Sequence, residues 1–354
     1  MKKKHTKYIK INTDSINRSY ICEAAEILRT GGLVAFPTET VYGLGANALD
    51  GKAVSTIFSA KGRPQDNPLI VHLARGEDVQ ALIAGDLPRQ AKQLMEAFWP
   101  GPLTLVLPKG KAVPDEVSAG LDTVAVRVPA HPVALALIEE AGLPVAAPSA
   151  NLSGRPSPTT AEHVYMDLNG RIDVILDGGP TNVGVESTVL DLTAAVPVIL
   201  RPGGVMIEEL KPLLGDVEMG SATSQSPAQK YKHYSPKVPM VLVEGERENV
   251  VAEIHRLVLG NREKGQTVGI LAPSESAQFY RDLAMEGDPD GAVRLITLGS
   301  RNDLQAMASS LFTRLRLFDD LQADVVYIEG VEPEGAGLAI MDRLRHAAIR
   351  CITV

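Results

Sequence analysis

Cations that suit phosphate occur where an apolar pattern gives way to a loop. Lys61 and Arg63 flank a glycine in the segment Ser59–Pro68, which we expect to follow a helix and precede a strand. Lysine supplies a point charge and arginine a planar fork, so the pair suits a phosphate group. A helix C-cap with two cations facing the helix dipole explains the same residues. This segment by itself leaves both interpretations open.

A second cation interrupts an apolar run. Arg127 lies within Val124–Val128. A buried arginine is costly unless it is paired, so we expect Arg127 to meet a carboxylate or an anionic ligand, unless its strand lies at an edge and the side chain faces water. His72 lies within the run Leu69–Leu73. By itself it indicates only a core histidine.

Four polar segments follow other apolar runs. Pro37–Gly45 reads Pro-Thr-Glu-Thr-Val-Tyr-Gly-Leu-Gly and brings hydroxyls, a carboxylate and a phenol to a strand end, where α/β sheets bind ligands. A tight turn capped by threonines is equally compatible with it. Ser149 and Asn151 follow Val145–Ala147 and would point to one side of an extended chain. The other two segments are Glu186–Thr188 and Arg201–Gly204.

Several common catalytic motifs are missing from the sequence. It contains no G-x-x-x-x-G-K-[ST] phosphate loop, no H-E-x-x-H metal motif and no G-x-S-x-G nucleophile elbow. The two cysteines, Cys22 and Cys351, lie too far apart for a zinc-ligand spacing, and we expect free thiols in a reducing compartment. The pattern therefore favours binding of anions without a protein nucleophile or a protein-bound metal.

Composition favours a small-molecule site over a broad nucleic-acid surface. The net charge of −8 is unlike that of a protein gripping a long phosphate backbone, and aromatic residues, which stack on bases, make up only 4%. No apolar segment follows the basic start, and no apolar run approaches the ~18 residues of a membrane span. We therefore expect a cytoplasmic protein without membrane contact.

The elements that must position these residues form two patterns. The first part of the chain mixes short apolar runs with helical patterns at 16–30, 87–98 and 132–141, which indicates a mixed α/β sheet. After a Ser-, Thr- and Gln-rich stretch, strand patterns at 240–243, 268–271, 293–298 and 325–328 alternate with helical patterns at 246–264, 275–285, 301–319 and 335–350. That alternation predicts a small Rossmann-like parallel domain.

The domain boundaries follow from these patterns and from the chain length. At 354 residues, two domains are expected. We predict a catalytic domain at 1–218, a linker at 219–238 and a C-terminal domain at 239–354.

Taken together, these segments resemble the YrdC-like family of threonylcarbamoyl-AMP synthases in its long, two-domain form. The resemblance covers nearly the whole chain. It rests on Lys-x-Arg at Lys61–Arg63 with Ser-x-Asn at Ser149–Asn151, on the segment Pro37–Gly45, on Arg-Pro-Gly-Gly at Arg201–Gly204, on His-Tyr-Ser-Pro at His233–Pro236 and on Gly337–Leu344.

The resemblance implies an open, twisted α/β sheet around a positively lined cavity, and a reaction. ATP, L-threonine and bicarbonate would give threonylcarbamoyl-adenylate and pyrophosphate. A separate transferase complex would then move the threonylcarbamoyl group to adenosine 37 of tRNA, so direct tRNA contact is expected to be weak or absent. Mg²⁺ would bind through the ATP phosphates, with no ligand from the protein.

The resemblance also implies roles for individual residues. Lys61 and Arg63 would be catalytic, with Lys61 offsetting phosphate or carbamate charge. Tyr234 would reach the nucleotide from the linker, which would act as a lid. The residues expected to bind threonine are Thr40, His72, Arg127 and Ser187. Those expected to bind ATP are Arg63, Asn67, Thr123, Ala147 (through its backbone), Ser149, Asn151, Ser157, Arg201 and Tyr234.

Two other functions compete with this interpretation. An RNA-binding module acting in translation is opposed by the acidic charge and the scarcity of aromatic residues. A carbamoyl-transfer enzyme related to hydrogenase-maturation proteins would carry zinc-finger regions, which two cysteines cannot form.

Overall fold

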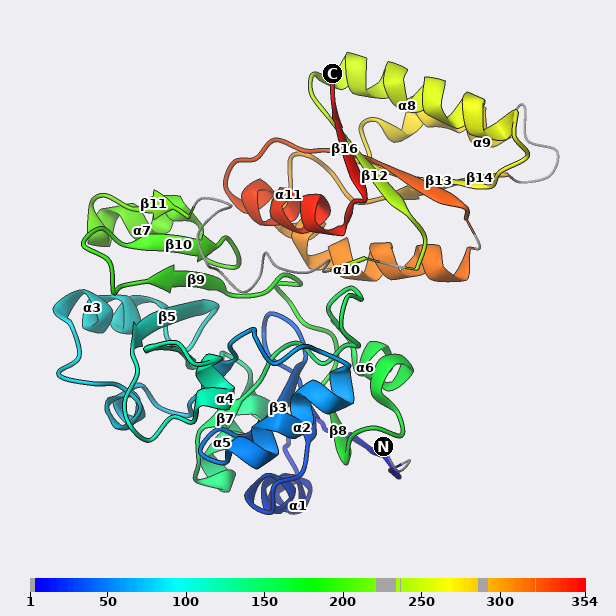
Figure 1. Cartoon of the computed structure of the whole chain (residues 1–354). Helices are drawn as coiled ribbons and strands as arrows, with labels where there is room; N and C mark the ends of the chain where they lie inside the picture. Colours follow the sequence, from blue (N-terminus) through cyan, green and yellow to red (C-terminus); the bar gives the residue numbers. More distant parts are fainter. Residues whose placement is uncertain (1–3, 221–233, 236, 286–291, 322) are drawn as a thin grey trace. The chain divides into compact units, whose positions relative to one another are not determined.

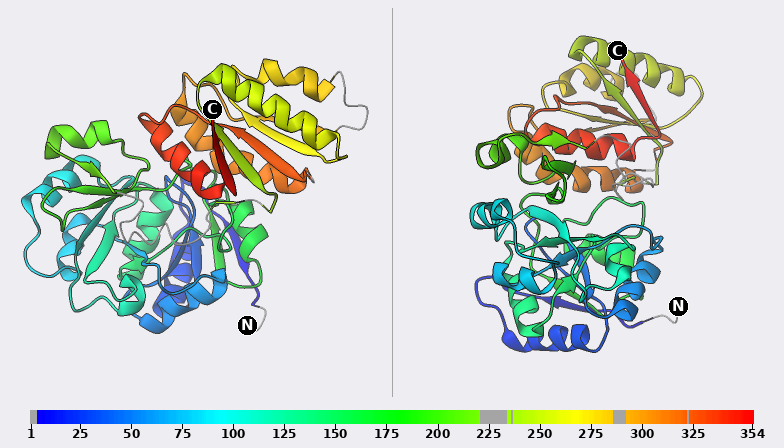
Figure 2. Two further views of the ribbon diagram at one scale, coloured as in Figure 1. Left: turned by 45° about the horizontal axis from the view of Figure 1, so that its top comes forward. Right: turned by 60° about the vertical axis from the view of Figure 1, so that its left-hand side comes forward.

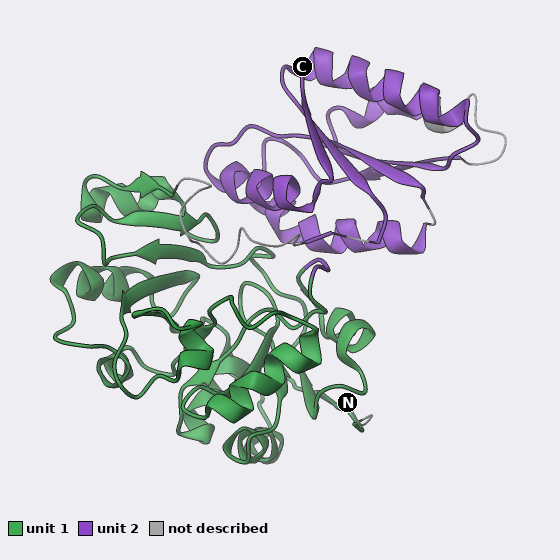
Figure 3. Ribbon diagram, viewed as in Figure 1, with its two compact units in different colours: residues 1–153, 157–230 green, residues 154–156, 231–354 purple. Residues whose placement is uncertain are grey.

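The computed structural model describes residues 4–220, 234–235, 237–285, 292–321 and 323–354. The chain divides into two compact units (Figure 3). Unit 1 comprises Met1–Ser153 and Ser157–Lys230, and unit 2 comprises Gly154–Pro156 and Tyr231–Val354. Most of the linker predicted at 219–238 lies outside the described residues.

In the described part of unit 1, eleven strands form one mixed sheet in the order β1-β8-β2-β3-β7-β4-β6-β5-β9-β10-β11 (Figures 1 and 2). The strands are β1 (Lys7–Lys10), β2 (Val34–Phe36), β3 (Gly43–Asn47), β4 (Ile70–His72), β5 (Leu103–Pro108), β6 (Thr123–Arg127), β7 (Val145–Ala146), β8 (Val174–Asp177), β9 (Thr188–Asp191), β10 (Val198–Arg201) and β11 (Glu218–Met219). The helices are α1 (Arg18–Arg29), α2 (Gly51–Lys61), η1 (Gly76–Ala81), α3 (Arg89–Phe98), α4 (Asp115–Ser118), α5 (Pro132–Ala141), α6 (Ala161–Leu168) and α7 (Ile207–Leu214).

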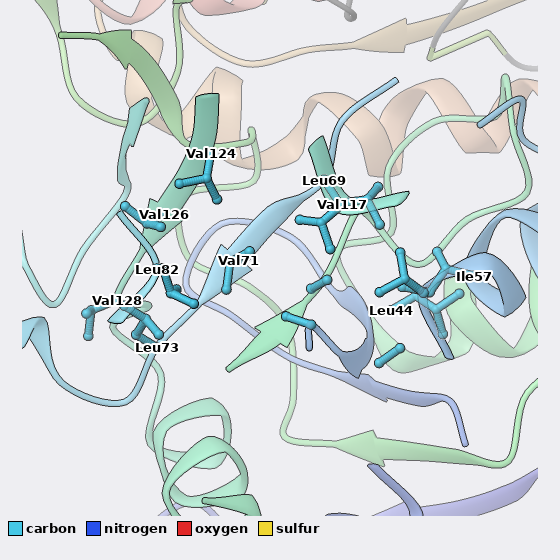
Figure 4. Close-up of a cluster of buried hydrophobic side chains, with 14 of the residues drawn as sticks. Leu44, Ile57, Leu69, Val71, Leu73, Leu82, Val117, Val124, Val126 and Val128 are labelled. Carbon is cyan, nitrogen blue, oxygen red and sulfur yellow. The ribbon is translucent and has the colours of Figure 1, made fainter. Parts of the chain in front are cut away.

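Alternation of side chains along these strands builds two hydrophobic cores on opposite faces of the sheet. The larger core takes one set from the central strands, including Val71 and Val126 (Figure 4). This set also includes Leu105, and it packs against α2, α3, α6 and α7. The smaller core takes the opposite set from β1, β2, β7 and β8 and covers it with α1 and α5, which pack against each other (Figure 1). The expected mixed α/β sheet is confirmed.

Three strands of unit 1, β1, β3 and β11, were not expected. The sequence left a ligand-binding strand end and a tight turn both open at Pro37–Gly45, whereas β3 begins at Gly43 and pairs antiparallel with both β2 and β7. Close packing explains why glycine stands in this strand. A Cβ on Gly45 would lie 2.7 Å from Val145 Cγ1 and 2.8 Å from Phe36 Cε1. The turn is therefore shorter, and the polar side chains of Thr38–Thr40 lie between two paired strands.

Unit 2 contains a parallel sheet in the order β14-β13-β15-β12-β16, with helices on both faces (Figures 1 and 2). The predicted Rossmann-like arrangement of a parallel sheet with alternating helices is confirmed. Its elements are β12 (Met240–Glu244), α8 (Arg247–Arg262), β13 (Val268–Ala272), α9 (Ala277–Met285), β14 (Val293–Thr297), α10 (Leu304–Asp320), β15 (Val325–Glu329), α11 (Ala336–Ala347) and β16 (Arg350–Thr353).

The helix predicted at 335–350 is too long. Helix α11 ends at Ala347, and Arg350–Thr353 forms the edge strand β16, parallel to β12. Ile349 N donates to Met240 O at 2.8 Å, so the chain leaves the helix to join the sheet. Pairing with β12 was not visible in the local pattern of the sequence. Within the described residues, no helix has the length and apolar character that a membrane crossing requires.

Candidate functional site

One face of the central strands of unit 1 carries several polar side chains among apolar ones. Val71, Leu105 and Val126 point into the larger core, so their neighbours along the same strands point to the opposite face. Neither hydrophobic core described above contains a side chain of this opposite face. We call it the polar face, and it consists of Ile70 and His72 of β4, Thr104 and Val106 of β5, Thr123, Ala125 and Arg127 of β6, and Val189 of β9.

Arg127 lies in the middle of this face, because β6 pairs with β4 on one side and β5 on the other. Its side chain is buried, with 3% of the residue exposed, so the possibility of an edge strand is excluded. Nη2 forms an ion pair with Glu39 Oε1 at 2.6 Å. Nη1 donates to Thr40 Oγ1 and Nε to Gly101 O, each at 3.0 Å. The expected carboxylate partner is thus supplied by the chain itself.

Arg127 retains N–H donors for a ligand. A guanidinium carries five N–H groups. Among the described residues, hydrogen bonds engage one N–H on Nε and one on Nη1, whereas Nη2 has the close ionic contact with Glu39 but no hydrogen-bond partner. The arrangement can therefore bind an anion, such as a carboxylate, without breaking the contacts that hold the guanidinium in place.

His72 lies beside Arg127 in the register of β4 and β6. The ring is buried, its Nδ1 lies 3.2 Å from Ile70 O, and it meets the Phe36 ring edge to face at 6.1 Å. Burial, and then the positive charge of Arg127, lowers the pKa of His72 to about 3. The imidazole is therefore neutral near pH 7, and Nδ1 donates its proton to the Ile70 carbonyl.

Lys61 ends α2 and is almost fully buried. Its Nζ donates to the carbonyl oxygens of Ser149 and Asn151 and, at 3.3 Å, to Asn151 Oδ1. Ser149 Oγ donates to the same Oδ1 at 2.6 Å. All three protons of the ammonium group thus go to oxygens of the Ser-x-Asn segment. Burial, and then the charge of Arg63, holds the pKa of Lys61 well below its usual value.

The Lys-x-Arg and Ser-x-Asn segments are therefore in direct contact, and Lys61 orients the Ser149–Asn151 loop. The C-cap interpretation also holds, because Gly62 closes α2 in the left-handed conformation, with φ 62°. A phosphate could reach Lys61 only by displacing one of these oxygens.

Ser187 and Arg201 form a further polar group next to the polar face. Ser187 directly precedes β9, and its Oγ lies 2.8 Å from Thr104 Oγ1. A register shift between Ile199 and Arg201 redirects the end of β10, and Arg201 donates to Ser187 O at 2.8 Å. Ser157 Oγ donates to Glu186, the residue before Ser187.

The remaining predicted site residues are distributed as follows. Asn67 is buried and Arg63 half-buried in the loop between α2 and β4, and Thr123 begins β6. Ala147 donates its backbone N–H to Ile70 O at 2.9 Å. Tyr234 belongs to unit 2, where its ring stacks on Phe312 with 5.3 Å between centroids. Its predicted contact with a nucleotide stays a prediction.

Sequence reasoning missed three residues that support the site: Glu39, Glu186 and Thr104. Glu39 and Glu186 lie within segments that the sequence singled out as polar, and their position beside the candidate binding residues was the available signal. Thr104 gave no such signal, because a lone threonine in the run Leu103–Leu107 is ordinary in a strand. Among the described residues, no group of three acidic, histidine or cysteine side chains could hold a metal ion.

Comparison with family models covers almost the whole chain. The model Sua5_yciO_yrdC, described as telomere recombination, matches residues 26–203. A model described as the threonylcarbamoyl-AMP synthase C-terminal domain matches residues 205–349.

Known proteins are similar over the same length. A threonylcarbamoyl-AMP synthase of Pyrococcus abyssi is 49% identical over 332 residues, which cover 92% of this chain and 93% of the relative. One of Bacillus subtilis is 48% identical, covering 94% of each. The crystal structure of P. abyssi Sua5 complexed with L-threonine superposes with a TM-score of 0.88 at 46% identity, covering 99% of both chains.

The buried neutral His72 predicts a pH-dependent loss of stability. Its folded-state pKa of about 3 lies below the ordinary value of about 6.5, so the unfolded chain binds the proton more readily. The stabilisation is present above pH 6.5 and is lost as the pH falls towards 3. Between pH 7 and 4.5, we expect the free energy of unfolding to fall by roughly 2–3 kcal/mol more in the parent than in His72→Gln.

Urea denaturation at the two pH values measures this difference. The exposed His5→Gln substitution in the same unit is the control and should follow the parent. Equal losses in the parent and His72→Gln would contradict the assignment.

The Lys61 contacts predict a local effect of substitution. Lys61→Met keeps the apolar stem and removes the donor from three buried oxygens, so we expect a loss of roughly 1–3 kcal/mol in stability and faster amide exchange at Leu152 and Ser153. Hydrogen exchange followed by mass spectrometry tests this. Lys52→Met, at an exposed position of the same helix, should leave exchange in that segment unchanged. Unaltered exchange in Lys61→Met would show that Lys61 does not hold the loop.

Proposed function

The chain belongs to the two-domain form of the Sua5/YciO/YrdC family, and from that membership we propose that it is a threonylcarbamoyl-AMP synthase. It joins ATP, L-threonine and bicarbonate to give threonylcarbamoyl-AMP and pyrophosphate. Support comes from curated relatives of that name at 49%, 48% and 40% identity, each matching over 92% or more of this chain. The P. abyssi structure that matches the whole chain was solved with L-threonine.

The observation that carries the proposal is the buried, preorganised guanidinium of Arg127. It retains N–H donors for a carboxylate on the polar face, and it is held there by Glu39, Thr40 and the Gly101 carbonyl. We assign it to the threonine carboxylate. Thr40 accepts a hydrogen bond from Arg127, and His72 lies beside Arg127 in the sheet. Together with Ser187, they complete the proposed threonine site.

ATP is proposed to bind next to threonine. Arg63 and Arg201 supply positive charge, and Lys61 shapes the Ser149–Asn151 loop that faces the nucleotide. The other proposed contacts are Asn67, Thr123, Ala147 and Ser157. ATP enters as its Mg²⁺ complex, in which the metal is bound by the phosphates.

The chemistry requires positioning rather than a protein nucleophile. Threonine's amine adds to carbon dioxide derived from bicarbonate, and the resulting carbamate oxygen attacks the α-phosphorus of ATP. The bond to pyrophosphate breaks, and pyrophosphate leaves. The protein must hold several anions close together and offset their repulsion, which fixed cations and hydroxyls do at no reorganisation cost.

The product is proposed to pass to a separate transferase complex that modifies tRNA adenosine 37. Its mixed anhydride hydrolyses in water, so exclusion of water from the site has a purpose. We propose that this occurs in the cytoplasm, where ATP and tRNA are available together.

The proposed reaction predicts pyrophosphate release that depends on all three substrates. Incubation with ATP, bicarbonate and labelled threonine should give pyrophosphate and a labelled adenylate, and omission of any one should reduce both to background. Replacing threonine and bicarbonate with carbamoyl phosphate should give no product. Tight tRNA binding in a filter assay without turnover of ATP would instead favour the RNA-binding alternative.

Unit 2 is proposed to support the nucleotide loop through Gly154–Pro156. This segment lies between Asn151 and Ser157 in sequence but belongs to unit 2. Within that unit, Arg155 forms an ion pair with Asp319 and Ser235 N donates to Gly154 O at 2.8 Å.

A truncation after Gly220 should therefore fold but work poorly. Both hydrophobic cores of unit 1 lie entirely within the retained residues, whereas the partners of Gly154–Pro156 are removed. We expect a cooperative thermal transition and a fall in turnover of roughly tenfold or more. Tyr234→Ala in the full chain is the companion variant. It removes the proposed lid side chain and keeps the partners of the loop. Full activity of the truncated protein would contradict both roles of the C-terminal part.

A further inference from the structure

Glu39 is a buried carboxylate to which the proposed reaction assigns no contact with a substrate. Its residue is 8% exposed, and its turn is fixed at several points. Val183 N donates to Glu39 O at 2.8 Å, and Gly184 N donates to Thr40 O at 3.1 Å. Thr38 Oγ1 lies 2.8 Å from Thr40 Oγ1 and donates to Val41 O at 2.6 Å. The carboxylate is therefore held in place before any ligand arrives.

We propose that Glu39 recognises the ammonium group of the amino-acid substrate, while Arg127 binds its carboxylate. The inference rests on the proposed function and deepens it, because it makes the ion pair a receptor for a zwitterion. Oε1 pairs with Arg127 at 2.6 Å, and Oε2 accepts from Ala130 N at 2.9 Å. A carboxylate has about four acceptor positions, so acceptor capacity remains beyond these two contacts with described residues.

Charge balance is the physical reason for this assignment. Glu39 and Arg127 cancel each other's charge in a site from which water is largely excluded. A ligand with only a carboxylate would leave one uncompensated negative charge there, which is costly in a medium of low dielectric constant. An α-amino acid carries both charges close together and leaves the site neutral. The pair therefore favours a zwitterion over a simple hydroxy acid.

The surrounding groups leave this charge balance intact. His131 caps α5, where its Nδ1 accepts a hydrogen bond from Val133 N at 3.2 Å. Burial lowers the pKa of His131, and the negative charge of Glu39 opposes this effect only in part. His72 is neutral for the reasons given above. Neither histidine therefore replaces Arg127 as the cation opposite Glu39 near pH 7.

The test compares two ligands that differ only in the amine. L-threonine and (R)-3-hydroxybutyrate share the carboxylate, the hydroxyl and the methyl group, and their binding to the full chain can be measured by calorimetry. In Glu39→Gln, we expect threonine affinity to fall at least tenfold. Hydroxybutyrate affinity should stay the same or rise, because Arg127 loses its competing charge. The preference of the parent for threonine would then shrink by at least the same factor.

A matched control comes from unit 2. Glu329 is buried and pairs with Arg301 at 2.7 Å, so Glu329→Gln removes the same kind of ion pair from a unit that contributes no residue to the proposed threonine site. It should leave the ratio of the two affinities unchanged. Thermal denaturation shows whether each variant folds, and Glu39→Asp provides a second variant that keeps the charge and should retain the preference for threonine.

Three outcomes would overturn the proposal. A parallel loss of both ligands in a folded Glu39→Gln would reduce Glu39 to a positioning residue for Arg127. Unchanged affinities for both ligands in Glu39→Gln would show that Glu39 does not contribute to the site. Loss of the preference for threonine in Glu39→Asp would show that the negative charge of Glu39 does not select threonine over hydroxybutyrate. Failure of the parent chain to bind threonine would instead contradict the proposed function itself.

Discussion

The site depends on the burial of a guanidinium in the middle of a sheet. Arg127 lies on a central strand, and its charge is balanced by Glu39 from the turn between β2 and β3. A buried arginine without that partner would destabilise the fold, since removing one member of such a pair leaves the other charge uncompensated. The turn, the strand and the charge pair therefore require one another. The same requirement places two opposite charges and a threonine hydroxyl together on the polar face.

The alternation of side chains explains how one sheet serves both stability and chemistry. On β4, β5 and β6, one set of side chains fills the larger core, and the alternate set includes His72, Thr104 and Arg127. On β2 and β7 the corresponding face is instead covered by α1 and α5. The polar face thus begins where the helical cover ends. This change of cover along a single sheet separates the helix-covered core from the face that carries His72 and Arg127.

The lysine at the end of α2 illustrates how a predicted binding residue acquires a structural role. Lys61 Nζ donates to three oxygens of the Ser149–Asn151 loop, which follows β7 in the chain. The loop carries a serine and an asparagine whose side chains also contact each other.

Local pattern was enough for much of this protein. Apolar periodicity located most of the strands, though not β1 or β11, and the helices α1, α3 and α5. The alternation after residue 239 indicated the parallel sheet of unit 2, because each of these signals arises within one segment. The sequence also singled out Arg127, Lys61 and the Ser-x-Asn loop from residue type alone.

The sequence could not show β3, where tight packing against Val145 and Phe36 demands glycine, or β16, whose existence depends on pairing with β12. Nor could it show that Glu39 faces Arg127, or that Thr104 supports Ser187. The two residues of the first contact lie 88 positions apart in the chain, and those of the second lie 83 apart. Only the order and register of the strands bring them together, because no local pattern encodes which distant charge or hydroxyl will lie next to a given side chain.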